Sequence, residues 1–221
     1  ACLLGGSAIN AGAFRPVRVV APEGTIVNPT WPAAVAGGNV ETSQRVVDVV
    51  LGALAQALPA RVPAASQGTM NNVMFGGWAA DRGTAFSYYE TLPGGSGGSP
   101  ARPRASAIQA HMTNTRNTPV EALEAELPVV VEGLRIRRGS GGRGRHPGGD
   151  GMERRVRFLR PARVSVLSDR RATRPYGLAG GEPGAPGRNR LVRSDGQVLE
   201  LPAKGTFEAE AGDTLEIATP G

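Results

Sequence analysis

Residues 66–72, Ser-Gln-Gly-Thr-Met-Asn-Asn, carry the side chains best suited to polar chemistry in this chain. The segment has no charged residue and is rich in amide and hydroxyl groups, which both donate and accept hydrogen bonds. A solvated loop more often uses Lys, Glu or Asp, so this composition indicates hydrogen bonding in a confined space. Thr69, Asn71 and Asn72 therefore have two interpretations. They bind a small polar substrate, or they join the loop to its neighbours through side-chain-to-backbone bonds.

A second block of neutral polar groups spans residues 108–119, IQAHMTNTRNTP, and adds a histidine and an arginine. His111 is the candidate for acid–base catalysis, because the ordinary pKa of a histidine lies close to neutrality. The alternative is a buried histidine whose hydrogen bonds are all satisfied by the protein. Asn114 is a candidate substrate-binding residue of the same block.

Arg116 is the one cation of this block, and it also has two interpretations. It binds an anionic intermediate, or it forms a structural ion pair with a carboxylate such as Glu41 or Glu90. Part of the block has a simpler explanation, since Thr118 followed three residues later by Glu121 is the pattern of a capping box at the start of a helix.

Metal-site and nucleophile patterns are not evident in the sequence. His111 and His146 are the only histidines and Cys2 is the only cysteine, which excludes an internal disulfide and a metal site built from cysteines. The histidines lack a partner at helical spacing, so we assign no metal ligand in this chain. We assign no serine as a catalytic nucleophile.

The chain is basic, with a formal net charge of +6, and the excess is local. Residues 131–200 contain 16 arginines against 7 acidic residues, an excess of 16 − 7 = 9. A basic face attracts nucleic acid or an acidic protein surface, but no nucleic-acid-binding motif or interleaved aromatic residues accompany these arginines. We therefore expect no nucleic-acid partner. No apolar run is long enough to span a bilayer and no secretion signal is evident, so we expect no membrane partner and a cytoplasmic protein.

One long helix is predicted between residues 39 and 58, with Asn39 as its N-cap and Pro59 after its end. Apolar residues recur there at intervals of three and four, which is the period of one helical face. The residues of this face are Val46, Val47, Val50, Leu51, Leu54 and Leu58. Small residues occupy much of the remaining surface, so we expect a central, buried helix.

The remainder of the chain predicts strands. Residues 85–91 form a strand candidate, and from residue 127 onward the apolar residues alternate with polar ones. Glycine-containing turns inside 191–201 and 206–217 predict two hairpins. The fold class is therefore α+β: a mixed helix–strand part over 1–127 with the central helix, followed by a β-rich, mainly antiparallel part over 128–221.

Several long motifs follow one another along the chain: GGNVETSQRVVDVVLGALAQALP, PAASQGTMNN, HMTNTRNTPVEALE, GGDG, SDRR and GLAGGEPG. Taken in this order, they resemble the hydantoinase B/oxoprolinase family. That family includes the B component of N-methylhydantoinases, the corresponding half of ATP-dependent 5-oxoprolinases and the alpha subunit of acetone carboxylase. The resemblance covers essentially all 221 residues.

The resemblance implies a division of labour between two components. A hydantoinase A-type component of actin-like fold binds ATP and phosphorylates a carbonyl or amide oxygen, and the B component completes ring opening or carboxylation. The resemblance therefore implies a hetero-oligomer that acts on a small cyclic amide, with ATP in the partner and no cofactor in this portion. The resemblance and the abrupt start at Ala1 lead us to expect the C-terminal portion of a longer protein. The His and Asp ligands of a divalent metal, where a family member has one, lie in the N-terminal portion of the family.

Three functions are compatible with these observations. The first is a portion of the B component of a cyclic-amide hydrolase, with His111 as the catalytic candidate and Thr69, Asn71, Asn72 and the residues of the second block as substrate-binding candidates. The second is an acetone-carboxylase-like carboxylating component. The third is an assembly module whose basic, β-rich part docks a partner protein without contributing chemistry.

Overall fold

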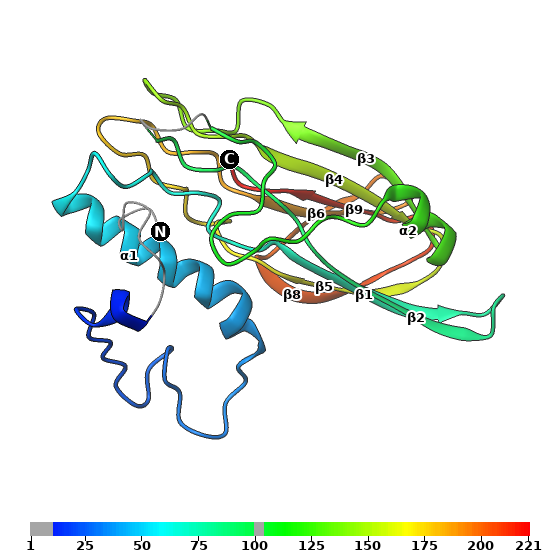
Figure 1. Cartoon of the computed structure of the whole chain (residues 1–221). Helices are drawn as coiled ribbons and strands as arrows, with labels where there is room; N and C mark the ends of the chain where they lie inside the picture. The colour runs from blue at the N-terminus through cyan, green and yellow to red at the C-terminus, as the bar shows by residue number, and fades with distance from the viewer. Residues whose placement is uncertain (1–10, 100–103) are drawn as a thin grey trace.

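The computed structural model describes residues 11–99 and 104–221. Within them, two antiparallel sheets pack against each other, and helix α1 (Ser43–Ala57) lies outside them on the side of the N-terminal segment (Figure 1). The short helix α2 (Val120–Glu126) covers the opposite end of the sheets. The α+β class and the antiparallel sheets predicted from the sequence are confirmed.

The first sheet has four strands in the order β2-β1-β5-β8 and the second has five in the order β3-β4-β9-β6-β7. The strands of the first are β1 (Asn72–Ala79), β2 (Thr84–Thr91), β5 (Ala162–Leu167) and β8 (Lys204–Ala209). Those of the second are β3 (Val129–Arg137), β4 (Gly151–Phe158), β6 (Arg188–Val192), β7 (Val198–Leu201) and β9 (Thr214–Ala218).

The hydrophobic core lies between the two sheets, because alternate side chains of each strand point inward. Phe75 of β1 packs edge-on against Phe158 of β4, with ring centroids 5.4 Å apart. Val164 of β5 and Leu215 of β9 are buried in the same cluster. The chain can build this core with few aromatic residues because valine and leucine fill most of it.

The predicted division of the chain at 127/128 stays a prediction, and the first sheet runs across it. Strands β1 and β2 come from the part before this position, and β5 and β8 come from the part after it. Strand β1 pairs with both β2 and β5, so main-chain hydrogen bonds join the two parts directly.

One of the two predicted hairpins is confirmed and the other is wrong. Strands β6 and β7 pair with each other as expected. The turn after β8, in contrast, carries the chain from one sheet to the other: β8 pairs with β5, and β9 pairs with β4 and β6. Buried Asp213 holds this crossing in place, because its carboxylate accepts hydrogen bonds from the amides of Ser194 and Glu210.

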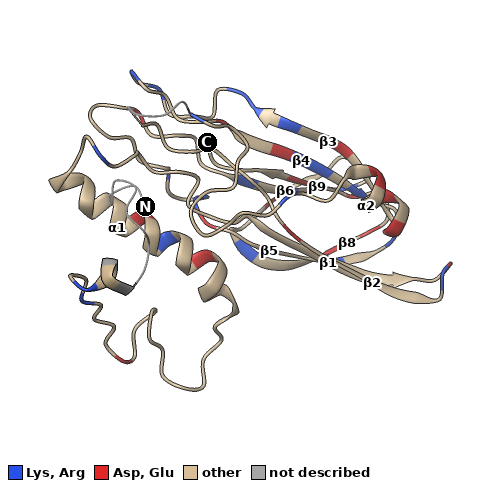
Figure 2. Cartoon of the chain, in the orientation of Figure 1, with Lys and Arg blue, Asp and Glu red and all other residues tan. Residues whose placement is uncertain are grey.

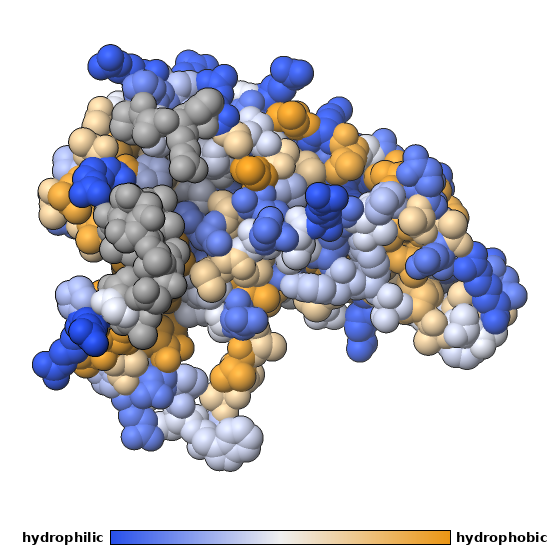
Figure 3. All heavy atoms as spheres, in the orientation of Figure 1, coloured by the Kyte–Doolittle hydropathy of each residue, from blue (hydrophilic) through white to orange (hydrophobic). Residues whose placement is uncertain are grey.

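Helix α1 is not the buried central helix that its apolar face predicted. Its buried residues are Gln44, Asp48 and Ala55, whereas Val49 is 66% exposed and Val50 is 51% exposed. Figure 3 shows apolar atoms at the surface on the side of α1 and the N-terminal segment. The helix therefore turns its polar side toward the sheets, and periodicity alone does not reveal which side is covered.

Both predicted helix caps are also wrong. Asn39, the predicted N-cap of the long helix, lies inside a π-helical turn over Gly38–Thr42 that precedes α1. The N-cap of this turn is Gly37. The N-cap of α2 is Pro119 rather than Thr118. The amide of Thr118 instead donates to the Glu90 carboxylate, so tertiary contacts replace the local capping box.

Several arginines on the outer faces of the sheets pair with acidic neighbours, and Figure 2 shows basic and acidic residues on both β3 and β4. Arg135, for example, donates to Glu153 at 2.6 Å. Arg154 is different, because it points into the core and pairs there with Glu90. Among the described residues, none of the helices is both long and apolar enough to cross a membrane.

Candidate functional site

A buried polar cluster forms where the polar side of α1 and its preceding turn meets three loops. Glu41, Gln44 and Asp48 lie on one side of the helix and its leading turn because they are three and four residues apart. They contact the loop 66–72 and the segments around His111 and Arg170, which are far apart in the sequence.

Asp48 is the ionic centre of this cluster. Its Oδ2 accepts from Arg170 Nη2 at 2.7 Å and from Arg45 Nη1 at 2.9 Å, and its Oδ1 lies 3.2 Å from His111 Nε2. The Asp48 and Arg170 side chains are only 2% and 4% exposed. Burial alone raises the pKa of Asp48, but the hydrogen bonds from His111 and Arg170 outweigh it and hold the pKa below its ordinary value. Asp48 is therefore a carboxylate at neutral pH.

His111 lies at the edge of the cluster with its ring turned inward and 15% exposed. Its Nε2 is 2.7 Å from Ser66 Oγ and also faces Asp48. In a serine-hydrolase triad, the serine and the aspartate contact opposite nitrogens of the ring. Here both contact the same nitrogen, so Ser66 is not set up as an activated nucleophile.

Glu41 is a second buried carboxyl group on the same side of the helix. Its Oε1 accepts from the Met70 amide at 3.0 Å and from Asn72 Nδ2 at 2.8 Å, whereas its Oε2 has no hydrogen-bond partner among the described residues. Burial raises the pKa of Glu41, and the nearby Thr69 side chain and the Met70 amide offset that effect only in part. Tyr89, which donates to Asn72 Oδ1 at 2.6 Å, links this carboxyl group to the outer face of the first sheet.

The predicted substrate-binding residues Thr69, Asn71 and Asn72 are all buried in the cluster. Thr69 Oγ1 accepts from the amides of Asn71 and Asp169. Asn71 Nδ2 donates to Gln67 Oε1 at 2.7 Å and to the Leu92 carbonyl oxygen at 3.1 Å. These contacts match the second of the two interpretations, in which the loop is joined to its neighbours. A role in substrate binding stays a prediction.

Arg171 extends the cluster behind this loop. Its Nη1 donates to Asn71 Oδ1 and its Nη2 donates to Asn189 Oδ1, both at 2.6 Å. Burial lowers the pKa of Arg171 to about 10, because the nearby carboxylates of Glu41 and Asp169 compensate only partly for lost hydration. The guanidinium still carries its charge at neutral pH and is held by neutral amides.

Asn114 and Arg116, the remaining predicted site residues, are exposed. Arg116 pairs with neither carboxylate proposed for it, because Glu90 binds Arg154 and Glu41 binds the 66–72 loop. Their role in substrate binding stays a prediction. Within residues 11–99 and 104–221, no group of three or more His, Cys, Asp or Glu side chains is arranged to hold a metal ion.

Backbone strain and unsatisfied polar atoms concentrate in this cluster. Asn71, His111 and Arg170 adopt positive φ angles of 48°, 57° and 58°, which non-glycine residues seldom do. Four buried side-chain atoms without a partner among the described residues also belong to it: Glu41 Oε2, Gln44 Oε1, Gln67 Nε2 and Arg170 Nε. Such features cost stability and gather at functional sites.

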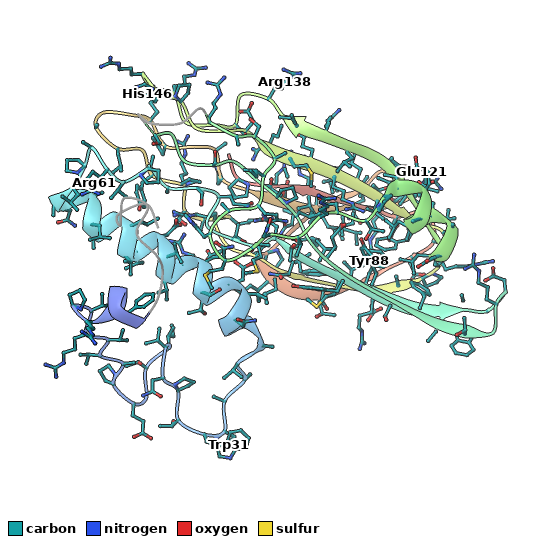
Figure 4. All side chains as sticks on the ribbon, viewed as in Figure 1. Trp31, Arg61, Tyr88, Glu121, Arg138 and His146 are labelled. Carbon is teal, nitrogen blue, oxygen red and sulfur yellow. The ribbon has the colours of Figure 1, made fainter. Side chains whose placement is uncertain are left out.

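A cavity of about 530 Å³ lies beside the cluster. Its walls are mainly glycine-rich loops, with Ala65, Tyr176 and His146 among the lining residues. Tyr176 joins it to the cluster by donating to the Asp48 carbonyl oxygen at 3.0 Å. Figure 4 shows His146 and Arg61 at the same end of the molecule, where α1 ends. The volume is that of a small-molecule site.

Comparison with known proteins identifies the family. The sequence profile of the family described as hydantoinase B/oxoprolinase matches residues 1–221. This chain belongs to the hydantoinase B/oxoprolinase family. The family resemblance predicted from the motifs is therefore confirmed.

Individual relatives agree with this family. The chain is 45% identical to 5-oxoprolinase 1 of Arabidopsis thaliana over 96% of its own length and 16% of that protein. It is 30% identical to a putative D-/L-hydantoinase, B component, of Pseudomonas sp. (strain NS671), covering 96% of this chain and 35% of that one. The fold matches the ATP-dependent caprolactamase of Pseudomonas jessenii with a TM-score of 0.74 and 22% identity, over 92% of this chain and 37% of that chain. The chain thus spans about a sixth to a third of the length of these two sequence relatives.

The sequence located part of this buried cluster but not its centre. It indicated His111 and the 66–72 loop, whereas Asp169, Arg170 and Arg171 appeared only within the SDRR motif. Arg170 forms an ion pair, and its partner is Asp48. The available signal was the polar stripe of Glu41, Gln44 and Asp48 within a helix otherwise rich in valine and alanine.

Proposed function

We propose that this chain is part of the B component of an ATP-dependent cyclic-amide hydrolase of the hydantoinase or 5-oxoprolinase type. The component completes ring opening of an intermediate that a hydantoinase A-type component activates with ATP. The 45% identity to a plant 5-oxoprolinase over almost the whole chain supports the substrate class. The Pseudomonas sp. relative is named as the B component of a hydantoinase, which supports a hetero-oligomer.

The cluster around Asp48 is the site at which this portion contributes to the reaction, and His111 is its acid–base residue. The observation that carries this assignment is the coincidence of strained backbone and unsatisfied buried atoms around the one histidine of the cluster. A loop that only connected α1 to β1 would have no reason to retain these costs. The portion itself binds no cofactor, ATP is bound by the partner, and the assembly works in the cytoplasm.

The test is ATP hydrolysis by the complete A and B components, with this chain in its full-length protein. The substrate panel is hydantoin, N-methylhydantoin, 5-oxoproline, and acetone with bicarbonate. Turnover that depends on one cyclic amide is the expected result and names the substrate. Turnover with acetone and bicarbonate alone would replace the hydrolase by a carboxylase, and a stable complex inactive on every substrate would favour an assembly module.

His111 is tested in the same assembly. His111→Gln is expected to lower kcat by roughly 10²-fold or more, the usual contribution of a positioned acid–base group. The control is Arg163→Gln, which changes a side chain that is 73% exposed on the first sheet and lies outside both the cluster and the cavity. Equal activity of the two variants, with assembly intact, would remove His111 from the mechanism.

A further inference from the structure

We propose that Asp48 is a positioning residue that holds neutral His111 in its Nε2–H tautomer, so that Nδ1 is the ring atom that exchanges a proton with the bound ligand. This inference rests on the proposed function for the identity of the ligand. The tautomer itself follows from the geometry of this chain.

The surroundings of Nε2 determine where the proton lies. Asp48 Oδ1 is 3.2 Å from this nitrogen, and an ionised carboxylate accepts hydrogen bonds but cannot donate them. A bare Nε2 would place its lone pair against a negative oxygen inside the protein. Ser66 Oγ, 2.7 Å away, is compatible with either form, because a hydroxyl group both donates and accepts. Asp48 therefore decides the tautomer, and the proton is on Nε2.

Asp48 is held firmly enough to impose this choice. Its Oδ2 is bound by the guanidinium groups of Arg170 and Arg45, which fixes the direction in which Oδ1 points. Gly68, with φ +64°, passes so close that a Cβ at this position would collide with Oδ2. The carboxylate thus has a fixed rotamer as well as a fixed charge.

The other ring nitrogen is available. His111 Nδ1 forms no hydrogen bond within the described parts of the chain, although the ring is only 15% exposed. The positive φ of His111, 57°, is a conformation that glycine would adopt at lower cost. An oriented ring with one nitrogen bound to a carboxylate and the other free is the arrangement of an acid–base histidine.

Histidine NMR tests the tautomer directly, because the chain contains only two histidines. In the 221-residue chain labelled with ¹⁵N-histidine, at a pH where the rings are neutral, His111 is expected to show a protonated Nε2 and an unprotonated Nδ1. His146, on an exposed loop, is the internal reference and should show averaged tautomers. A protonated Nδ1 on His111 in the wild-type chain would overturn the proposal.

Asp48→Asn gives a second, opposite expectation. Arg170 and Arg45 need an acceptor, so they bind the new amide oxygen and turn its NH₂ group toward His111. That donor requires a bare Nε2, and the tautomer should switch to Nδ1–H. Ser66→Ala, which leaves Asp48 in place, should keep the wild-type tautomer. A switch in Ser66→Ala with none in Asp48→Asn would assign the orienting role to the serine instead.

The catalytic consequence is read in the complete enzyme. Asp48→Asn should lower kcat by about 10²-fold or more with a small change in KM, since the working nitrogen then carries the wrong proton. Glu208→Gln, in the exposed pair with Arg163, is the control for loss of a carboxylate. If NMR gives the Nε2–H tautomer but no cyclic amide is turned over, the proposed function fails while the orientation by Asp48 stands. If Asp48→Asn switches the tautomer and keeps full kcat, the proton-transfer role of Nδ1 fails.

Discussion

The loss of Asp48 tests whether the buried cluster is held together as the structure indicates. Asp48→Ala leaves the Arg170 guanidinium without its carboxylate, in a place where the side chain is 4% exposed. Its Nε already lacks a partner among the described residues. Removing one partner of a buried ion pair costs about 3–5 kcal/mol. Arg45 adds little to this cost, because at 29% exposure it can turn toward water.

A matched control exists on the surface of the first sheet. Glu208 pairs with Arg163 at 2.8 Å, but the two side chains are 63% and 73% exposed. An exposed pair of this kind contributes about 0–1 kcal/mol. Glu208→Ala should therefore lower the free energy of unfolding by a small fraction of what Asp48→Ala does, although both changes remove one carboxylate.

Urea denaturation of the 221-residue chain measures both effects. The midpoint should fall for Asp48→Ala with an unchanged m-value, which is the signature of lost stability without a change in the surface exposed on unfolding. Asp48→Ala combined with Arg170→Ala should be less destabilised than the sum of the single variants, because the double variant no longer buries an unpaired charge. Equal midpoints for Asp48→Ala and Glu208→Ala would refute the buried ion pair.

Three further changes test other features of the same region. The raised pKa of Glu41 means that ionisation of this side chain opposes folding. The free energy of unfolding of Glu41→Gln should therefore equal that of the wild type at low pH and exceed it increasingly as the pH rises above 4.5, the ordinary pKa. A pH series of urea titrations measures the difference between the two proteins, and a difference that does not change with pH would contradict this expectation. Gly68→Ala should cost well over 1 kcal/mol through strain and collision with Asp48, whereas Gly180→Ala, also at positive φ but in open space, should cost only about 1 kcal/mol by the same titration. Val49→Gln should change the free energy of unfolding by less than about 0.5 kcal/mol, because the Val49 side chain is exposed. Ala55→Gln overfills a buried position and should cost about 1–3 kcal/mol. Thermal unfolding compares the two variants, and a larger loss for Val49→Gln would mean that α1 buries its valine side.

Long-range contacts explain why one hairpin was predictable and the other was not. The Asp-Gly turn between β6 and β7 closes two strands that pair with each other. A similar glycine-containing turn ends β8, yet the next strand joins the other sheet. The difference lies in long-range contacts of Asp213 with Ser194 and Arg193, which no local pattern contains.

The helix shows a different limit of sequence reasoning. The apolar period of α1 correctly predicted that a helix forms and that it ends before Pro59. The prediction of the buried side was wrong, because periodicity identifies two sides and not what covers each. Gln44 and Asp48 lie outside the predicted apolar face, and they are the residues that contact the loops. His111 could be identified from its chemical type alone, but its partner could not.

The orientation of α1 is also what assembles the site. A helix rises about 1.5 Å per residue, so Glu41 and Asp48 present two carboxyl groups about 10 Å apart along one side. Glu41 accepts hydrogen bonds from the amide of Met70 and the side chain of Asn72. Asp48 accepts a hydrogen bond from Arg170 and also contacts His111. The pKa of Glu41 is raised, whereas the pKa of Asp48 is lowered. The orientation of α1 therefore gives the two carboxyl groups opposite electrostatic environments, and the one whose pKa is lowered, Asp48, is the one that contacts His111.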